Sequence, residues 1–345
     1  MRDVDESGKS ASPVPLVGRS AELDDLDGLL AAVGSGEGAV VLLEGEAGIG
    51  RSRLVQGLAA GGELLGVGLS LIGFPGPTAD ELDDLLAEGS GRPRALVLDD
   101  IHLAGDDVLA VLTRHAHAGP LAGTLVVLTL RPVPYREALQ AMVVAWVRAG
   151  ACNLELRPLS AAAVVELAES LTGCHVGPML RGVLATAGGN PRLATAVITA
   201  AQRAGSLRLC DDGVADIEGF GWQDELDEVA RDHIAYLDPE VLRLLAQAAV
   251  LGPSFVVPDL AALADLPLTT CWRTLRHALA AGVVAARGDR LVFRHDLVRT
   301  ALYAGLEHDL RRALHARAAS TLGEAGAPPH VVASHLERAR AVRRA

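Results

Sequence analysis

The chain is poor in lysine, aromatic residues and cysteine. It has one lysine, Lys9, among 31 basic residues, and aromatic residues make up 3% of its 345 positions. With so few rings, its cores must be packed mainly from leucine, valine and alanine. The four cysteines are widely spaced and match neither a zinc-site nor a disulfide pattern: Cys152, Cys174, Cys210 and Cys271. We therefore expect reduced, partly buried thiols, as in a cytoplasmic protein.

Long apolar segments are also missing. The first six residues contain no apolar core of a signal peptide, and no later run is long enough to cross a bilayer. The net charge of −12 argues against a surface that coats nucleic acid. Residues 338–344 are locally basic, and we interpret them as a solvated helix end. We expect a cytoplasmic protein without a membrane partner.

A phosphate-binding motif is present near the N-terminus. Residues 45–52 read Gly-Glu-Ala-Gly-Ile-Gly-Arg-Ser, which is the pattern G-x-x-x-x-G-K-[ST] with Arg51 in place of lysine. An apolar run precedes it and a helical pattern follows, the order that this motif requires. The glycines let successive backbone N–H groups turn inward, and Ser52 supplies a hydroxyl for Mg²⁺. We predict ATP or ADP with Mg²⁺ as cofactors, held by Gly45, Glu46, Ala47, Gly48, Ile49, Gly50, Arg51, Ser52 and Arg53.

The arginine leaves two interpretations open. Arginine is a planar fork and lysine a compact point charge, so the exchange is not conservative at phosphates. Losing one charged hydrogen bond would cost roughly 1.5–3 kcal/mol, or about a 10- to 150-fold loss of affinity. One interpretation is therefore binding with impaired hydrolysis. The other is ordinary turnover, with Arg51 introduced by the same bias that leaves only one lysine in the chain.

The pattern along the chain alternates short β-type runs with helical runs. Expected strands are 39–44, 64–72, 94–99, 123–130 and 152–156, and expected helices are 52–60, 78–88, 106–117 and 135–148. This alternation predicts an α/β P-loop NTPase fold, a parallel sheet with helices on both faces.

The rest of the chain is expected to be helical, apart from two short strand pairs. The expected divisions are a disordered lead-in (1–14), a P-loop nucleotide-binding domain (15–158), a helical lid and linker (159–221), a winged-helix-like domain (222–308) and the start of a helical-repeat region (309–345). Helices should fill 160–204, with a hairpin or linker around 211–213. The wing should pair 282–286 with 291–293.

A second acidic element follows the third expected strand. The apolar run 94–98 leads directly into Asp99 and Asp100. Taken alone, this is a strand end capped by turn-forming residues. Downstream of a phosphate loop, it is the arrangement that holds Mg²⁺ in P-loop NTPases. We predict that Asp99 and Ser52 hold the metal and that Asp100 orients or deprotonates the attacking water.

Several short motifs occur together in one order. They are Val17-Gly18-Arg19, the phosphate loop, Asp99-Asp100-Ile101-His102, Thr129-Leu130-Arg131-Pro132, Gly189-Asn190-Pro191 and Phe293-Arg294-His295-Asp296. This order resembles the ATPase part of the large ATP-binding regulators of the LuxR family, which belong to the STAND class of signalling ATPases. The resemblance covers roughly residues 16–340.

The resemblance implies further roles. Val17, Gly18 and Arg19 would line the adenine side of the site, and Pro191 would pack near the base. Arg131 would read the γ-phosphate as a catalytic sensor, and His295 would contact the phosphates of ADP and lock a closed state. Singly, these motifs are also ordinary turns, strand ends and helix caps.

The chain departs from these regulators at Arg51, where the phosphate-loop pattern has lysine. It also departs at Leu103, where they carry tryptophan. It also ends where their sensor begins, so we expect no direct DNA-binding module. The resemblance implies an ATP- or ADP-dependent regulatory switch that is linked to transcriptional control and has a protein partner or self-associates. The alternatives are an active, possibly slow, ATPase and a nucleotide-free interaction scaffold.

Overall fold

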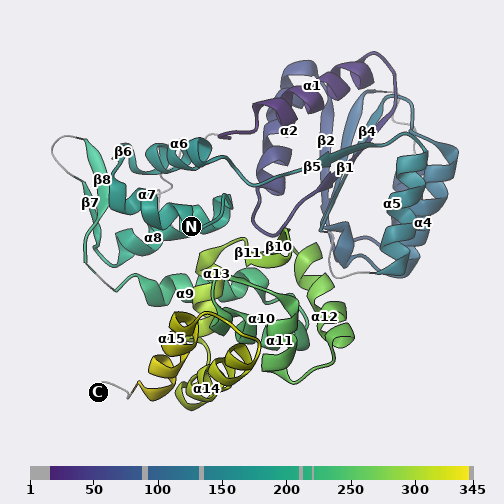
Figure 1. Cartoon of the computed structure of the whole chain (residues 1–345). Helices are drawn as coiled ribbons and strands as arrows, with labels where there is room; N and C mark the ends of the chain where they lie inside the picture. Colours follow the sequence, from purple (N-terminus) through teal and green to yellow (C-terminus); the bar gives the residue numbers. More distant parts are fainter. Residues whose placement is uncertain (1–15, 88–91, 132–135, 210–212, 220, 342–345) are drawn as a thin grey trace, which may run out of the picture.

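The computed structural model describes residues 16–87, 92–131, 136–209, 213–219 and 221–341. Within these ranges, the first half of the chain builds a parallel sheet in the order β2-β3-β4-β1-β5 (Figure 1). Its strands are β1 (Ala39–Glu44), β2 (Gly68–Gly73), β3 (Arg94–Asp99), β4 (Thr124–Leu130) and β5 (Cys152–Glu155). The central strand β4 is buried along its whole length, as expected for a strand covered on both faces.

Helices cover both faces of this sheet. One face packs against α1 (Ser20–Gly34) and α2 (Arg51–Leu65) through a leucine- and valine-rich core. The other packs against α3 (Ala79–Ala87), α4 (Asp106–Ala118) and α5 (Glu137–Arg148), with the short 3₁₀ turn η1 (Ile101–Leu103) after β3. Alternate residues of β1, β3 and β4 enter the two cores, and the predicted P-loop NTPase fold is confirmed.

The second strand was predicted in the wrong place. The expected strand 64–72 begins inside α2, which continues to Leu65, and the strand itself starts at Gly68. Leu64 and Leu65 are 89% and 53% exposed, so the apolar run that suggested a strand is partly a solvent-facing helix end. Gly66 ends this helix in the left-handed conformation, with a φ of 69°.

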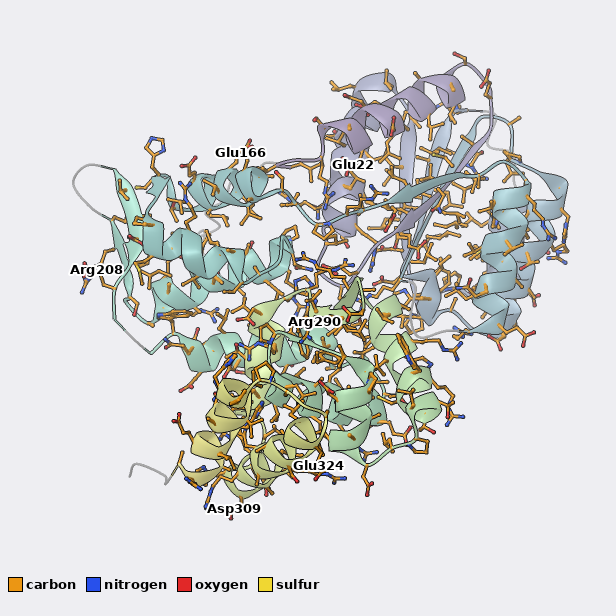
Figure 2. The ribbon with its side chains drawn as sticks, viewed as in Figure 1. Glu22, Glu166, Arg208, Arg290, Asp309 and Glu324 are labelled. Atoms are coloured by element: carbon orange, nitrogen blue, oxygen red, sulfur yellow. The ribbon has the colours of Figure 1, made fainter. Side chains whose placement is uncertain are left out.

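The prediction that residues 160–204 are wholly helical is wrong at one short strand, β6 (His175–Val176). The lid contains α6 (Ala161–Thr172), α7 (Pro178–Ala185), α8 (Pro191–Arg203) and three short strands, β6, β7 (Leu207–Leu209) and β8 (Val214–Ile217). The predicted hairpin is present as the antiparallel pair of β7 and β8, and β6 adds to it in parallel. Its tip, residues 210–212, lies outside the described residues, as does the predicted lead-in 1–14. Charged side chains such as Glu166 and Arg208 lie on the outside of this lid (Figure 2).

A winged-helix-like part follows. Its elements are α9 (Gln223–Ile234), α10 (Pro239–Leu251), β9 (Ser254–Phe255), α11 (Val257–Ala264), α12 (Leu268–Ala280), β10 (Val284–Arg287), β11 (Arg290–Phe293) and α13 (Asp296–Ala304). The predicted wing is the antiparallel pair of β10 and β11. One continuous apolar core joins this part to the lid. The chain continues into α14 (His308–Glu324) and α15 (Pro329–Arg340). In the described ranges, none of the helices has the length and apolarity needed to cross a membrane.

Two buried histidines join the last two helices. His315 of α14 and His335 of α15 face each other with their Nδ1 atoms 2.8 Å apart, and Tyr303 Oη lies 2.8 Å from His315 Nε2. Both histidines are buried, at 1% and 5% exposure. Burial lowers the pKa of His315 to about 4, and the nearby positive charges of His335, Arg338 and Arg311 act in the same direction. His315 is therefore neutral at pH 7.

We expect this histidine to make stability depend on pH. Because its pKa is lower in the folded state than in the unfolded state, its contribution is complete above about pH 6.5 and is lost as pH falls towards about 4. The full loss is about 3 kcal/mol. The free energy of unfolding, measured with urea between pH 7 and pH 4.5, should therefore decrease less steeply with falling pH for His315→Gln than for the unchanged protein. The exposed His117→Gln is the control, and an identical slope for all three would contradict the assignment.

Candidate functional site

The phosphate loop lies between β1 and α2. Gly48 and Gly50 take left-handed backbone conformations, with φ of 70° and 108°, and Gly50 is the N-cap of α2. These conformations suit glycine and turn the loop so that its N–H groups and the positive end of α2 face one region. Ser52 is exposed in the first turn of that helix. This geometry can accommodate an anion.

Arg51 is folded back onto its own loop. Its Nη1 donates to the carbonyl oxygens of Gly45 and Glu46, the second at 3.3 Å, and its Nη2 donates to Asp100 Oδ1 at 2.9 Å. The side chain is 7% exposed. Burial lowers the pKa of Arg51, Asp100 opposes that shift, and the charge of Arg131 adds to it. Arg51 therefore pairs with the carboxylate that was predicted to activate water.

A buried threonine links the two aspartates at the end of β3. Thr129, in the neighbouring strand β4, donates its hydroxyl to Asp99 Oδ1 and accepts from the backbone N–H of Asp100 at 2.8 Å. Asp100 has a left-handed backbone, with φ of 57°. His102 Nδ1 lies 3.6 Å from Asp100 Oδ1, and burial lowers the pKa of His102 to about 4. Asp99 and Asp100 are thus held at the same edge of the sheet as the phosphate loop.

The segment before α1 packs on the lid and the loop. Val17 is buried in the lid core, and a Cβ on Gly18 would lie 2.7 Å from the Cβ of Ala163. Arg19 donates to the carbonyl oxygens of Ile49 and Arg157 at 3.2 and 2.7 Å. Arg19 therefore joins the phosphate loop to the connection between β5 and the lid.

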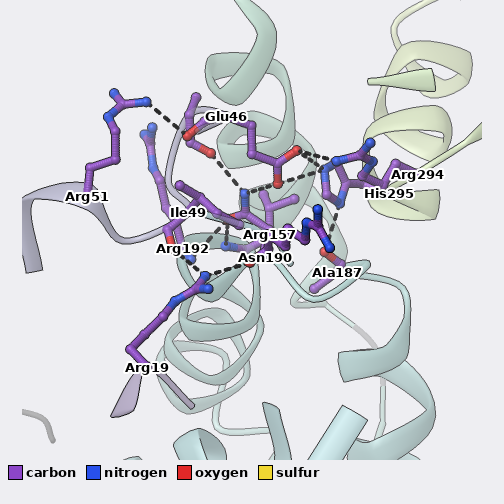
Figure 3. Close-up of polar contacts among 12 residues, drawn as sticks. Arg19, Glu46, Ile49, Arg51, Arg157, Ala187, Asn190, Arg192, Arg294 and His295 are labelled. Carbon is purple, nitrogen blue, oxygen red and sulfur yellow. Dashed lines mark hydrogen bonds and ion pairs between the residues drawn. The ribbon is translucent and has the colours of Figure 1, made fainter. Parts of the chain in front are cut away.

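Glu46 is the point at which three parts of the chain meet (Figure 3). This loop carboxylate is 8% exposed and accepts from Asn190 Nδ2 of the lid at 2.7 Å. From the winged-helix-like part, His295 Nε2 lies 3.3 Å from Glu46 Oε1 and Arg294 Nη1 lies 3.6 Å from Glu46 Oε2. Burial alone would raise the pKa of Glu46. The hydrogen bonds and charges of His295, Asn190 and Arg294 outweigh burial and lower it.

The start of α8 fits closely against the same loop. Asn190 caps the helix through its side-chain oxygen, and its Nδ2 also donates to Ala47 O at 2.8 Å. Pro191 is the first helical residue, and the backbone N–H of Arg192 donates to Gly48 O at 3.3 Å. A Cβ on Gly48 would lie 2.6 Å from the Cβ of Arg192, so this position has no room for a side chain. Pro191 is thereby placed next to the loop.

Two further rings border the site. His295 Nδ1 lies 2.9 Å from Ala187 O, and its ring meets that of His233 edge-on, with the centroids 5.4 Å apart. Arg131 follows β4, and its Cζ lies 5.2 Å from the centroid of the Tyr236 ring. These contacts connect Arg19, Asp100 and His295 to the loop, whereas the described contact of Arg131 is with Tyr236.

The sequence did not reveal several residues of this arrangement. Asn190 and Arg294 stood inside quoted motifs but had no predicted role, and Thr129 stood beside Arg131 in the same way. His233 and Tyr236 lie at the end of α9 outside any motif. Their three-residue spacing was the only available signal, and it is common to any helix.

The sheet topology and the position of the loop define a P-loop NTPase fold. No family model and no curated protein matches the sequence. The chain is similar in structure to the Aeropyrum pernix ORC2 protein, with a TM-score of 0.51, 15% identity and coverage of 86% of this chain and 96% of that one. This likeness supports the fold.

Two other solved structures resemble the chain less closely. Thermotoga maritima RuvB, a Holliday junction branch migration motor, has a TM-score of 0.47, 20% identity and coverage of 81% and 94%. A STAND protein with a tetratricopeptide repeat sensor from Pyrococcus horikoshii has a TM-score of 0.37 and 14% identity. The comparison with the latter covers 96% of this chain but only 49% of the archaeal one.

Proposed function

We propose that this protein is an ATP- and ADP-binding regulatory switch with weak hydrolysis. The observation that carries the proposal is the convergence of the sheet domain, the lid and the winged-helix-like part on Glu46, a residue of the phosphate loop. A ligand held by this loop would be in contact with all three parts. Binding of that ligand would therefore shift the equilibrium between arrangements of the three parts that bind it with different affinity.

The residues around the loop suit the phosphates of a nucleotide. Among the described residues, Arg51 Nε of the phosphate loop is buried without a hydrogen-bond partner. Unpaired buried donors are costly, and phosphate oxygens are strong acceptors. Bound Mg²⁺ would supply charge neutralisation at the phosphates, with Ser52 and Asp99 as its protein ligands. Val17, Gly18, Arg19 and Pro191 would border the base, and His295 would approach the phosphates.

The position of Arg51 supports the proposal of weak hydrolysis. Its guanidinium donates a hydrogen bond to the carboxylate of Asp100, which would otherwise be free to orient a water molecule. A slow ATPase is the second candidate, and it is supported by the hydrogen bonds that Thr129 makes to Asp99 and Asp100 at the same edge of the sheet as the loop. The proposed link to transcription rests on the resemblance to LuxR-family regulators. In that setting, loss of the contacts that Asn190, Arg294 and His295 make with Glu46 would expose a surface for a protein partner or a second copy.

The test is the nucleotide content of the gently purified protein. The protein is denatured and the released bases are separated and quantified. About one ADP per chain, with little phosphate release on added ATP, would support the switch. Steady release of phosphate would favour the ATPase. A protein that carries no nucleotide and binds neither ATP nor ADP with Mg²⁺ would rule out both and leave the scaffold.

Removal of the Ser52 hydroxyl should separate metal binding from phosphate binding. In Ser52→Ala we expect affinity for ATP with Mg²⁺ to fall about tenfold, and affinity without Mg²⁺ to change much less, because the lost group ligates the metal. Calorimetric titrations with and without EDTA measure both values. Ser35→Ala, at the exposed end of α1, is the control. An equal loss in both conditions would remove the metal role from Ser52.

A further inference from the structure

Arg131 is held against an aromatic ring and not against a carboxylate. Its Cζ lies 5.2 Å from the centroid of Tyr236, within the range of a cation–π contact. Its buried Nε has no hydrogen-bond partner among the described residues. Tyr236 lies just past α9, on the connection into α10. The residue predicted to read a third phosphate is therefore attached to the winged-helix-like part.

His233 contacts His295, the other residue predicted to approach the phosphates, in a similar way. It is 2% exposed and meets the ring of His295 edge-on, at 5.4 Å and 82°. Burial, together with the charge of His295, lowers the pKa of His233 to about 4, so this ring is uncharged at pH 7. An uncharged ring can pack against His295 without repelling it.

Both rings lie near the end of α9. His233 is in its last turn, and Tyr236 lies two residues beyond Ile234, where the helix ends. The helix α9 packs against both α8 of the lid and α13, which begins directly after His295 (Figure 1). The last turn of α9 and the residues just after it thus contact Arg131 of the sheet domain and His295 of the winged-helix-like part.

We propose that Tyr236, assisted by His233, holds Arg131 away from the phosphates and so gives the site a preference for a nucleoside diphosphate over a triphosphate. The inference rests on the proposed function. To contact a third phosphate, Arg131 has to leave the ring of Tyr236 and lose the cation–π contact. A diphosphate requires no such movement. Tyr236 and His233 are positioning residues in this scheme.

The experiment compares the affinities of ADP and ATP, each with Mg²⁺, in the full chain with substitutions at Tyr236. Tyr236→Leu removes the ring, and the ATP-to-ADP ratio of dissociation constants should fall about 3- to 10-fold. Tyr236→Phe keeps the ring face, and the ratio should stay within about twofold of the unchanged protein. Tyr236→Trp offers a stronger face and should raise the ratio.

The chain offers a matched control. Arg311 Cζ lies 5.1 Å from the centroid of Tyr303, the same contact at the far end of α13. Tyr303→Leu should leave the ratio unchanged, and circular dichroism checks that each variant is folded. If Tyr236→Leu does not fold, the opposite shift in Tyr236→Trp still tests the proposal.

The outcomes separate the two levels of inference. An unchanged protein that binds neither nucleotide defeats the proposed function itself. If it binds both but Tyr236→Leu and Tyr236→Trp leave the ratio unchanged, the positioning role is overturned while the switch stands. A parallel loss of both affinities in Tyr236→Leu would mean a purely structural role. A shift in Tyr236→Phe as large as in Tyr236→Leu would also overturn it, because the ring face would then be irrelevant.

Discussion

In Arg51→Lys we expect ATP turnover to rise by at least about tenfold. The guanidinium of Arg51 donates to Asp100 at 2.9 Å and to two carbonyl oxygens of its own loop. Lysine has a single ammonium group and cannot make this fork. The substitution should free Asp100 to orient water and place a point charge among the phosphates. One charged hydrogen bond is worth about 1.5–3 kcal/mol, which corresponds to about 10- to 150-fold in rate.

Phosphate release at saturating ATP and Mg²⁺ measures this change. Arg114→Lys on α4 serves as the control, because Arg114 is exposed and pairs with Asp83 and not with Asp100. Turnover in that variant should match the unchanged protein. If Arg51→Lys also leaves turnover unchanged, the arginine does not limit hydrolysis. The pairing of Arg51 with Asp100 then does not explain weak turnover.

Glu46→Gln should loosen the joint between the three parts of the chain. The substitution keeps the shape of the side chain but removes the charge that faces Arg294 and His295. Leaving the buried donor of His295 and the partly exposed guanidinium of Arg294 without their carboxylate partner costs about 2–3 kcal/mol. We expect the free energy of unfolding in urea at pH 7 to fall by that amount. Glu63→Gln, an exposed change on α2, should have almost no effect.

Acid provides a second test of the same carboxylate. Because the pKa of Glu46 is lowered in the folded state, its contribution is present above its ordinary value of 4.5 and is lost as pH falls through the lower, folded value. The difference between Glu46→Gln and the unchanged protein should therefore be constant near neutral pH and shrink below about pH 4.5. A difference that persists undiminished at pH 3 would mean that packing, and not charge, explains the loss.

The sequence predicted the sheet and the phosphate loop well because both are locally encoded. A continuous apolar run makes a buried strand, and Gly48 and Gly50 give the loop its shape whatever surrounds it. The misplaced second strand shows the limit of this reasoning. Leu64 and Leu65 are apolar but exposed, and periodicity cannot reveal that a helix end faces solvent.

The site could be predicted only in part for a related reason. Asp99, Asp100 and Ser52 belong to motifs whose spacing follows from strand, loop and helix. The pairing of Glu46 with His295 joins positions 249 residues apart and depends on how whole parts of the chain dock. The attachment of Arg131 to Tyr236 is of the same kind. No local pattern encodes such contacts.

The shared core of the lid and the winged-helix-like part determines how the molecule can move. Because one apolar cluster runs through both parts, they should move as one rigid body that rotates about the connection between β5 and α6. The described contacts between these two parts and the phosphate loop include hydrogen bonds and ion pairs centred on Glu46 and Asn190. Water can replace such contacts at little net cost, whereas splitting an apolar core is expensive. Opening should therefore be cheap and reversible, and its equilibrium should respond to ionic strength more than to temperature.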